Sequence, residues 1–376
     1  MMQNSNSTFI DSKKHLLMLD ALRGIAAIMV VIMHTFEMFC EGNYHNLFIN
    51  HGYLAVDFFF MLSGYVMAHA YDDRWHKMTV VDFCKRRLIR LHPLMLLGMI
   101  LGAALFYLQV SSATFPKIAG TSVSQLLLTM VIGFTLIPIP PSMDIRGWNE
   151  MHPLNGPAWS LFFEYIANIL HVYILRKLSN LFLSLLVLLA AAALIHLVTT
   201  NASGDLIGGW SLEPEQLRIG FTRLLFPYMA GMLLRRIVKL RRTKKTFLFT
   251  SVLLVLVLSF PRVGGYEKVW VNGLYESFVI IIMFPLIIYL GAIGEVKGLA
   301  TQKVCTLLGD ISYPLYITHF PFICIYYAWV TNNKISMTQG APTGILLIIG
   351  VIGLAYVWLR IYDLPIRKWL ANRLIF

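Results

Sequence analysis

The sequence predicts an all-α integral membrane protein, and three observations carry that prediction. Of the 376 residues, 57% are hydrophobic and only 13% are charged, whereas a soluble domain carries roughly a quarter charged residues. The mean hydropathy of +0.68 over the whole chain leaves no room for a large soluble domain. Apolar runs of about 20 residues, the length that crosses a bilayer, recur along the sequence. We therefore expect one transmembrane domain over residues 1–376.

The candidate spans are apolar runs of about that length, and we expect about ten transmembrane helices. They cover residues 16–38, 53–71, 92–110, 158–176, 181–200, 220–238, 246–260, 273–292, 305–330 and 343–362. The run 246–260 is short for a span. The tail 363–376 is predicted to be a short amphipathic end.

A further apolar run, 123–140, decides the topology. Counting it as a span would place the basic run 235–245 outside the cell. Leaving it out, with a cytoplasmic N-terminus, puts that run inside together with Lys13 and Lys14, as the positive-inside rule requires. We therefore predict that 123–140 forms a re-entrant or interfacial helix within a long outer loop, 111–157. The same topology places both termini in the cytoplasm.

The net charge of +12 follows from this topology and does not indicate a nucleic-acid partner. The basic residues lie in short loops between apolar runs, where retention of Lys and Arg in the cytoplasm explains them. The four cysteines form no C-x-x-C pair and fall in different loops and spans, which argues against a zinc site and against a disulfide framework. We expect no nucleic acid and no metal.

The first predicted span carries Arg23 and His34, and charged groups inside a bilayer are costly and usually functional. Their separation of eleven residues is three helical turns plus roughly 20°, so both side chains point the same way, about 16 Å apart along the axis. One face thus carries a cation near the cytoplasm and an imidazole nearer the outside. Two plainer interpretations stay open: Arg23 extends to the inner interface, and His34 makes a helix–helix hydrogen bond.

The second and fourth spans add polar groups. Asp57 lies near the outer end of the second span, where it could also cap the helix. Ser63 lies near mid-membrane, where a small residue allows close helix packing or leaves a slot. In the fourth span, Ser160 and Glu164 share one helix face, four residues apart. Glu164 is then about 9 Å below the outer surface, a costly place for a carboxylate.

The ninth span carries a stripe of Ser312, Tyr316 and His319, although Tyr316 could be an ordinary interior aromatic. The predicted topology places one group of polar residues in a single outer layer: His34, Asp57, Glu164 and His319. Three arginines, Arg23, Arg87 and Arg90, lie towards the cytoplasm in this topology. This arrangement suits a path open to a polyanion on the inside and to a base on the outside.

Five segments in this order resemble the acyltransferase-3 family of membrane proteins, which includes enzymes that O-acetylate lipopolysaccharide O-antigen, peptidoglycan and other glycans. The matching segments are LDALRGIAAIMVVIMH (19–34), DFFFMLSGYVM (57–67), RRLIRLHP (86–93), NGPAWSLFFEY (155–165) and LGDISYPLYITHFP (308–321). Each segment alone is weak evidence, but the ordered set extends over nearly the whole chain.

The resemblance implies roles for these residues. His34 is expected to be the catalytic base, oriented by Glu164 or Asp57. Arg87 and Arg90 are expected to hold the nucleotide end of acyl-CoA, because arginine binds phosphate through paired hydrogen bonds. We expect the remaining polar residues of the path to contribute to the donor site as well. They are Arg23, Ser63, Tyr316 and His319.

The function implied is transfer of an acyl group, with acetyl favoured, from cytoplasmic acetyl-CoA to a carbohydrate hydroxyl at the far side of a bacterial inner membrane. The acceptor would be an O-antigen, an exopolysaccharide or a similar glycan, with membrane lipid around the protein. Direct transfer and an acyl-His34 intermediate both stay open. The alternatives are a transporter of a lipid-linked sugar or small solute and an inactive scaffold. A homo-oligomer is neither indicated nor excluded.

Overall fold

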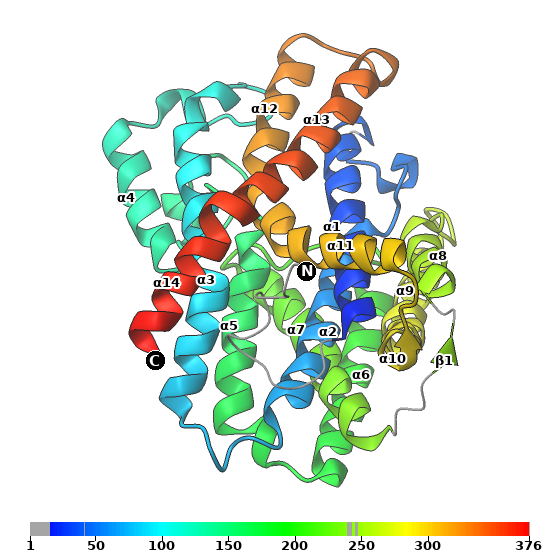
Figure 1. Ribbon diagram of the computed structural model, residues 1–376. Helices are drawn as coiled ribbons and strands as arrows, with labels where there is room; N and C mark the ends of the chain where they lie inside the picture. The colour runs from blue at the N-terminus through cyan, green and yellow to red at the C-terminus, as the bar shows by residue number, and fades with distance from the viewer. Residues whose placement is uncertain (1–15, 41, 239–242, 245–246, 376) are drawn as a thin grey trace.

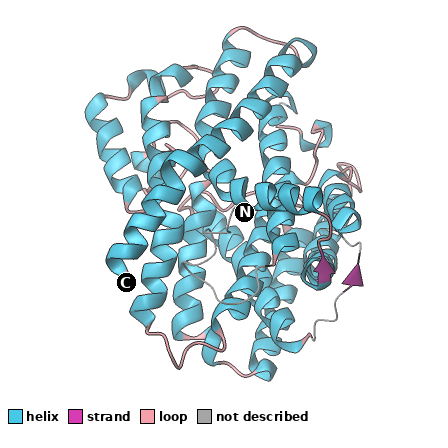
Figure 2. Ribbon diagram, in the orientation of Figure 1, coloured by secondary structure: helices cyan, strands magenta, loops and turns pink. Residues whose placement is uncertain are grey.

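The computed structural model describes residues 16–40, 42–238, 243–244 and 247–375, and most of the chain is helical (76%). Figures 1 and 2 show helices throughout, joined by loops of different lengths. Within the described ranges the one sheet is a parallel pairing of two-residue strands, β1 (Thr243–Lys244) and β2 (Gly294–Glu295). The predicted all-α class is confirmed. Lys13, Lys14 and residues 239–242 and 245 of the basic run lie outside the described residues.

The helices fall into two groups along the chain. Before β1 come α1 (Leu17–Glu37), α2 (Ala55–Tyr71), α3 (Val80–Ala104), α4 (Val123–Phe134), α5 (Ala158–Tyr173), α6 (Asn180–Thr200) and α7 (Pro214–Ile237). After it come α8 (Phe247–Ser259), α9 (Val269–Phe278), α10 (Phe284–Ile293), α11 (Leu299–Thr318), α12 (Phe320–Asn332), α13 (Met337–Trp358) and α14 (Leu364–Leu374). One π-helical turn joins α9 to α10 and another joins α13 to α14.

Seven helical stretches of the described chain are long enough and apolar enough to cross a membrane. They are Leu17–Cys40, Gly52–Tyr71, Val80–Ala104, Ala158–Lys177, Asn180–Thr200, Val269–Ile293 and Met337–Leu374. The protein is therefore a multi-pass membrane protein. The other predicted spans fall on a helix with five charged residues (α7), on a helix with polar residues along its length (α11), or on helices of only 13 residues (α8 and α12). The predicted count of ten therefore stays a prediction.

Two predicted spans differ in extent from the helices observed. The span predicted at 92–110 begins at Val80, because Thr79 and Asp82 form a capping box that starts α3 earlier. Arg87 and Arg90 therefore lie within a helix. The span predicted at 305–330 is divided at His319, where α11 ends and α12 begins.

A helix does occupy the region predicted to be re-entrant or interfacial. Helix α4 has 12 residues, starts with a capping box at Ser122 and packs against α3. Leu126 and Thr129 are among its few buried residues. Its position relative to a bilayer stays a prediction.

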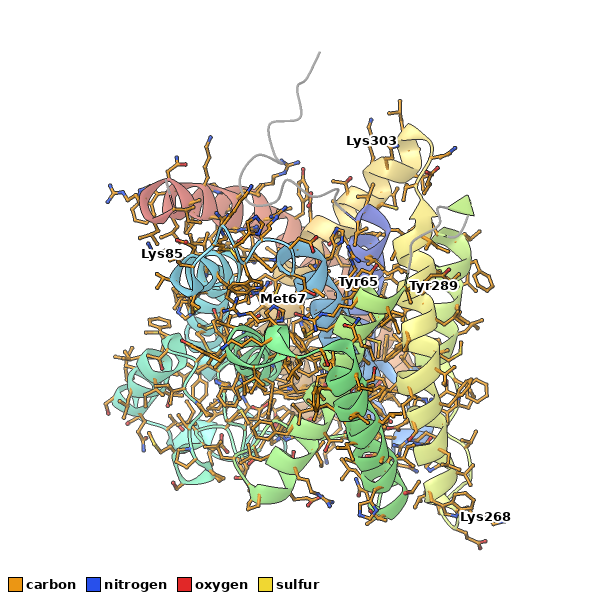
Figure 3. The ribbon with its side chains drawn as sticks, turned by 90° about the horizontal axis from the view of Figure 1, so that it is seen from below. Tyr65, Met67, Lys85, Lys268, Tyr289 and Lys303 are labelled. Atoms are coloured by element: carbon orange, nitrogen blue, oxygen red, sulfur yellow. The ribbon has the colours of Figure 1, made fainter. Side chains whose placement is uncertain are left out.

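Two lysines that the predicted topology assigns to opposite sides of the membrane lie towards opposite ends of the molecule. Figure 3 shows Lys85 and Lys303 towards one end and Lys268, which precedes α9, at the opposite end. The placement of Lys85 and Lys268 on opposite sides of a membrane stays a prediction. Helix α14 lies beside α3 (Figure 1), where Lys85 Nζ donates to the Leu374 carbonyl at 3.0 Å.

Glycines let the central helices touch backbone to backbone. A Cβ atom on Gly64 of α2 would lie 2.0 Å from the Tyr228 carbonyl oxygen of α7, and one on Gly231 of α7 would lie 2.0 Å from the Met61 oxygen of α2. The two helices therefore fit only because both residues lack side chains. Such contacts are typical of helix association in lipid, where burial of apolar surface gives no driving force.

Helices α1 and α11 meet in the same way. A Cβ atom on Gly24 would lie 2.2 Å from the Leu308 oxygen, and one on Gly309 would lie 2.7 Å from Cβ of Asp20. This pairing brings the polar face of α1 against the polar stripe of α11. Arg23 Nε donates to Ser312 Oγ at 2.8 Å across that contact.

The segment 150–160, which leads into α5, is buried inside the protein. Helix α5 therefore starts in the interior of the protein. The start is fixed by Asn155, whose Nδ2 donates to the Ile317 carbonyl at 2.8 Å. That carbonyl is left free because Pro321, four residues later, has no N–H to donate. Asn155 thus ties the start of α5 to the break between α11 and α12.

The glycine contacts give a stability prediction. Gly64→Ala should destabilise the protein by about 1–3 kcal/mol or more, because a well-packed interface must move to admit the methyl group. The control is Gly350→Ala, since nothing lies within 4 Å of a Cβ at that position. Thermal unfolding of both variants in one detergent, followed by loss of the monodisperse size-exclusion peak, measures the difference. Equal melting temperatures would contradict the packing argument.

Candidate functional site

Two cavities meet in the middle of the helix bundle. The first, named here the arginine cavity, has a volume of about 100 Å³ and is bounded by Arg23, Arg87 and Arg90. The second, the histidine cavity, has a volume of about 620 Å³ and contains His34 in its wall. Val56 and Tyr316 line both cavities. These two side chains therefore form the boundary between them.

The arginine cavity holds three guanidinium groups against one carboxylate. Arg87 pairs with Glu164 at 2.5 Å, and Ser63 Oγ donates to the same carboxylate oxygen at 3.0 Å. Arg23 is bound to Ser312 and lies 3.1 Å from Asp20 on its own helix.

Arg90 has no hydrogen bond or ion pair to any other described residue. Arg90 is half-buried, and a cation that is partly removed from water without a counterion is costly. Arg90 is therefore the group in this cavity that an anionic ligand would neutralise.

The boundary between the cavities is held by hydrogen bonds. Tyr316 OH and Ser160 Oγ lie 2.7 Å apart, and Ser160 Oγ donates to the Pro157 carbonyl at 3.0 Å. Phe59 meets the Tyr316 ring edge-on, with 5.3 Å between ring centres. The shared stripe of Ser312 and Tyr316 predicted for the ninth span is confirmed, and it connects the two cavities.

In the histidine cavity, His34 is bound to a carboxylate that the sequence reasoning missed. His34 Nδ1 lies 2.9 Å from Glu37 Oε2, one helical turn away. Tyr44 OH donates to the other oxygen of Glu37 at 3.0 Å, and Tyr327 OH donates to the His34 carbonyl. With Nδ1 donating to Glu37, Nε2 keeps the lone pair and can act as a base. The i, i+3 spacing of His34 and Glu37 could have revealed this pair.

Asp57 was predicted to orient His34, and the structure shows a different partner. Asp57 is fully buried and pairs with Arg223 of α7 at 2.8 Å. Arg223 also donates to the carbonyls of Tyr53 and Gly208, at 2.7 and 3.1 Å. The prediction failed because the predicted span 220–238 contains a buried cation, Arg223, that competes for Asp57.

Glu164 was also predicted to orient His34 from the outer layer, and that placement is wrong. It lines the arginine cavity, bound to Arg87 and Ser63. The depth was counted from a helix start at the membrane surface, whereas α5 starts inside the protein. Glu164 therefore lies deeper than its position in the sequence suggests.

His319 lies against His34 but lines neither cavity. The two rings stack with 5.6 Å between centres and an angle of 24°. His319 Nδ1 faces the carbonyls of Leu315 and Tyr316 at 3.0 and 2.9 Å, so it carries the proton. Its Nε2 has no hydrogen-bond partner in the structure. The predicted contact of His319 with an acyl donor is thus not supported by its position, which is beside the candidate base.

A comparison with protein-family models matches residues 17–360 to the acyltransferase-3 model, described as an acyltransferase domain. The chain belongs to the acyltransferase-3 family. This membership confirms the resemblance seen in the five sequence segments. No solved structure matches this acyltransferase-3 chain.

Curated relatives of this family member include bacterial O-acetyltransferases. It is 25% identical over 368 residues to the O-acetyltransferase OatA of Staphylococcus aureus, covering 95% of this chain and 58% of that protein. It is 22% identical over 388 residues to the peptidoglycan O-acetyltransferase OatA of Listeria monocytogenes, covering 95% and 56%. A shorter match, 34% over 158 residues, is to protein 2 in the picA locus of Rhizobium radiobacter, covering 40% and 78%. The chain thus spans less than three-fifths of the length of the two OatA proteins.

The loop before α5 supplies a second pair that the sequence reasoning did not single out. Arg146 is fully buried and lies 3.3 Å from Glu150 Oε2 and 3.2 Å from the Gln109 amide oxygen. Burial raises the pKa of Glu150 to about 7, while Arg146 acts in the opposite direction. In the same loop, burial lowers the pKa of His152 to about 4. Glu150 lines the histidine cavity, whereas Arg146 does not.

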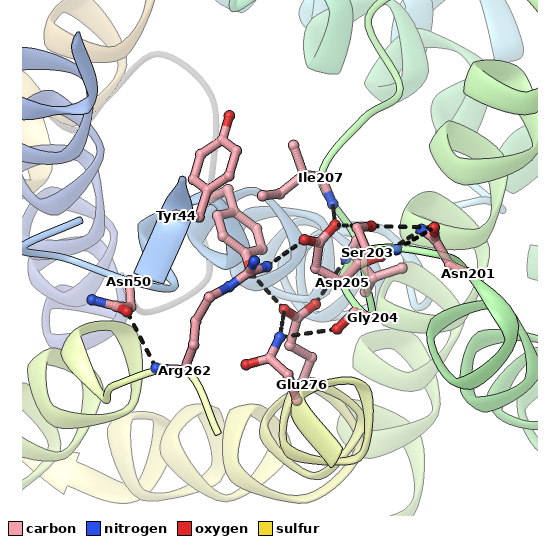
Figure 4. Close-up of polar contacts among 12 residues, drawn as sticks. Tyr44, Asn50, Asn201, Ser203, Gly204, Asp205, Ile207, Arg262 and Glu276 are labelled. Atoms are coloured by element: carbon pink, nitrogen blue, oxygen red, sulfur yellow. Dashed lines mark hydrogen bonds and ion pairs between the residues drawn. The ribbon is translucent and has the colours of Figure 1, made fainter. Parts of the chain in front are cut away.

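A third pair, Arg262 and Asp205, lies behind two tyrosines of the histidine cavity (Figure 4). Arg262 is paired with Asp205 and donates to Tyr53 OH at 3.3 Å, with its guanidinium 5.6 Å from the centre of the Tyr44 ring. Tyr53 OH donates in turn to Glu276 Oε1 at 2.5 Å. Tyr44 and Tyr53, two of the tyrosines that line the cavity, are therefore held from behind by this network.

The buried pair of Asp57 and Arg223 gives a second prediction. Asp57→Ala should cost about 3–5 kcal/mol, since it leaves Arg223 as an uncompensated buried charge. Asp57→Leu combined with Arg223→Met should recover most of that stability. The control is Glu215→Ala, which breaks an exposed pair with Arg218 and should have little effect. Chemical or thermal unfolding in detergent measures all three; equal losses in the single and double variants would contradict the pairing.

Proposed function

We propose that this protein is a membrane O-acyltransferase that moves an acyl group, with acetyl favoured, from acyl-CoA in the arginine cavity to a carbohydrate hydroxyl in the histidine cavity. The observation that carries the proposal is the juxtaposition of a cavity with an unpaired arginine and a cavity with a histidine–glutamate pair, separated only by Val56 and Tyr316. Family membership and the OatA relatives support the reaction class.

The donor end is argued from charge. CoA carries phosphates, which arginine binds through charge-assisted hydrogen bonds. Arg90 is free to make such bonds, whereas Arg87 is already held by Glu164. The pantetheine arm would extend past Arg23 towards Tyr316 and present its thioester at the boundary. We place the Arg90 end in the cytoplasm, where acyl-CoA is made, and the protein in a bacterial inner membrane.

The chemistry is argued from His34. Its Nε2 accepts the proton of the acceptor hydroxyl as that oxygen attacks the thioester carbonyl carbon. The carbon–sulfur bond breaks, and CoA leaves as a thiolate that takes up a proton. Glu37 holds the imidazole in the tautomer with a free Nε2 and stabilises the imidazolium that forms, as a carboxylate does in a catalytic triad. An acyl-His34 intermediate would use the same nitrogen as the nucleophile.

The proposal predicts loss of transfer in two variants from opposite cavities. Purified protein with radiolabelled acetyl-CoA and a mixed pool of bacterial surface glycans should label a glycan. His34→Ala should abolish labelling because the base is lost. Arg90→Ala should raise the KM for acetyl-CoA by about tenfold or more because a charged contact is lost.

The controls for that assay are His196→Ala and Arg218→Ala, which remove exposed side chains of the same types. Near-normal transfer by His34→Ala would rule out both variants of the mechanism. Absence of acyl-CoA binding to the wild type, in a direct binding measurement, would favour the transporter instead.

A fourth prediction concerns Glu37 as the positioning residue. Glu37→Gln should lower kcat by about 10²- to 10⁴-fold, the loss seen when a triad carboxylate becomes an amide, with the KM for acetyl-CoA unchanged. Glu37→Asp should restore part of the rate. Steady-state kinetics over pH 5–9 provide the measurement, with Glu215→Gln as the control. A Glu37→Gln rate within twofold of wild type would show that Glu37 only packs against Tyr44.

A further inference from the structure

Each described arginine in or directly behind the wall of the histidine cavity is paired with a carboxylate. The only cation in the cavity wall, Arg223, is bound to Asp57 and is 1% exposed. Behind the wall, Arg262 is bound to Asp205. None of these groups is available to pair with a ligand.

Two carboxylates line the same cavity, and their situations differ. Glu150 is paired with Arg146, which lies behind it and is fully buried. Glu37 is bound to His34, which balances its charge only when the imidazole is protonated. The described wall is therefore neutral to negative, in contrast to the arginine cavity, where Arg90 is unpaired.

The wall also presents aromatic rings between these acidic groups. Trp148, Trp159 and Trp210 line the cavity together with Tyr53 and Tyr327. Aromatic faces pack against the apolar C–H face of a sugar ring, and carboxylate oxygens accept hydrogen bonds from its hydroxyl groups. A cavity with these groups and no available cation has nothing to neutralise a carboxylate or phosphate on the sugar.

We propose that the histidine cavity accepts a sugar unit that is uncharged or basic and excludes an acidic one, and that Glu150 and Glu37 set this charge selectivity. The identity of the ligand as a sugar rests on the proposed function. Glu150 is the specificity-determining residue, because it covers the buried cation Arg146. Gly156 makes room for it: a Cβ at position 156 would lie 2.6 Å from Glu150 Oε1.

The exclusion has a physical cause that does not depend on the sugar's shape. An acidic sugar would lose its hydration on entering the cavity and find no charge to replace it. It would also approach the carboxylates of Glu37 and Glu150, and bringing like charges together at an interface is unfavourable. An uncharged sugar meets neither penalty.

The test measures the charge of the cavity directly. A single cysteine at Ala113, an exposed residue of the cavity wall, is introduced with Cys84→Ser, which removes the exposed native thiol. Trimethylammonium-ethyl and sulfonatoethyl methanethiosulfonates, equal in size and opposite in charge, react with it at pH 8. Intact-protein mass spectrometry gives the two rates, each normalised to that of a free thiol.

The cationic reagent should react about tenfold faster than the anionic one, a difference typical of a charged cleft. Glu37→Gln and Glu150→Gln should each lower that ratio by about threefold, and Glu215→Gln should not change it. Glu150→Gln leaves the Arg146 charge uncompensated beside the cavity. Adding Arg146→Met removes that charge and should restore the wild-type ratio. The double variant also keeps the test valid if Glu150→Gln alone folds poorly. A wild-type ratio of one or less, or a ratio unchanged by both glutamate variants, would overturn the proposal.

The transfer assay separates this inference from the proposed function. Labelled glycan is partially hydrolysed, and the labelled units are resolved by ion exchange. Label on uncharged or amino sugars supports the inference. Label on uronic acids or phosphorylated sugars overturns it. If no glycan is labelled under any condition, the proposed function fails. The reagent ratio still decides the charge of the cavity in that case.

Discussion

Direct backbone contact between helices is the constraint on which the rest of this structure depends. In lipid, apolar surface gains little by moving from hydrocarbon to another helix, so association relies on close packing and polar contacts. Gly64 and Gly231 bring α2 against α7, and Gly24 and Gly309 bring α1 against α11. All the groups of both cavities are carried by these four helices or by segments packed on them. The site is therefore a product of the helix contacts, and a small displacement at a glycine would separate its parts.

Paired charges then fix how the helices are rotated. Asp57 on α2 meets Arg223 on α7, and Arg87 on α3 meets Glu164 on α5. Each pair costs desolvation and is weak evidence for stability, yet a misrotated helix would leave a charge uncompensated, which is far worse. A charged group that lacks an oppositely charged partner is therefore an exception in this structure. Arg90 is the clearest of them among the described residues, and it points to a ligand.

Composition and periodicity were sufficient for the fold class and for the positions of most helices, because an apolar run must be a helix to cross lipid. The two ends of α1, with Arg23 and His34 in different cavities, also followed from helical geometry. The depth of each residue within the protein did not follow from helical geometry. Glu164 was misplaced because α5 begins inside the protein, and the partner of His34 was missed because Glu37 lies close to the helix end, where a carboxylate is expected to be solvated. Such errors reflect loops that fold inward, which periodicity does not report.

The inward loop before α5 also bears on how the protein is assembled. It carries Arg146 and Asn155, whose partners Cys324 and Ile317 lie 178 and 162 residues later in the chain. A segment with these polar groups cannot rest in hydrocarbon alone. The loop can therefore make all of these contacts only when α11 and α12 are present. The histidine cavity is consequently complete only when the C-terminal helices α11 and α12 are in place.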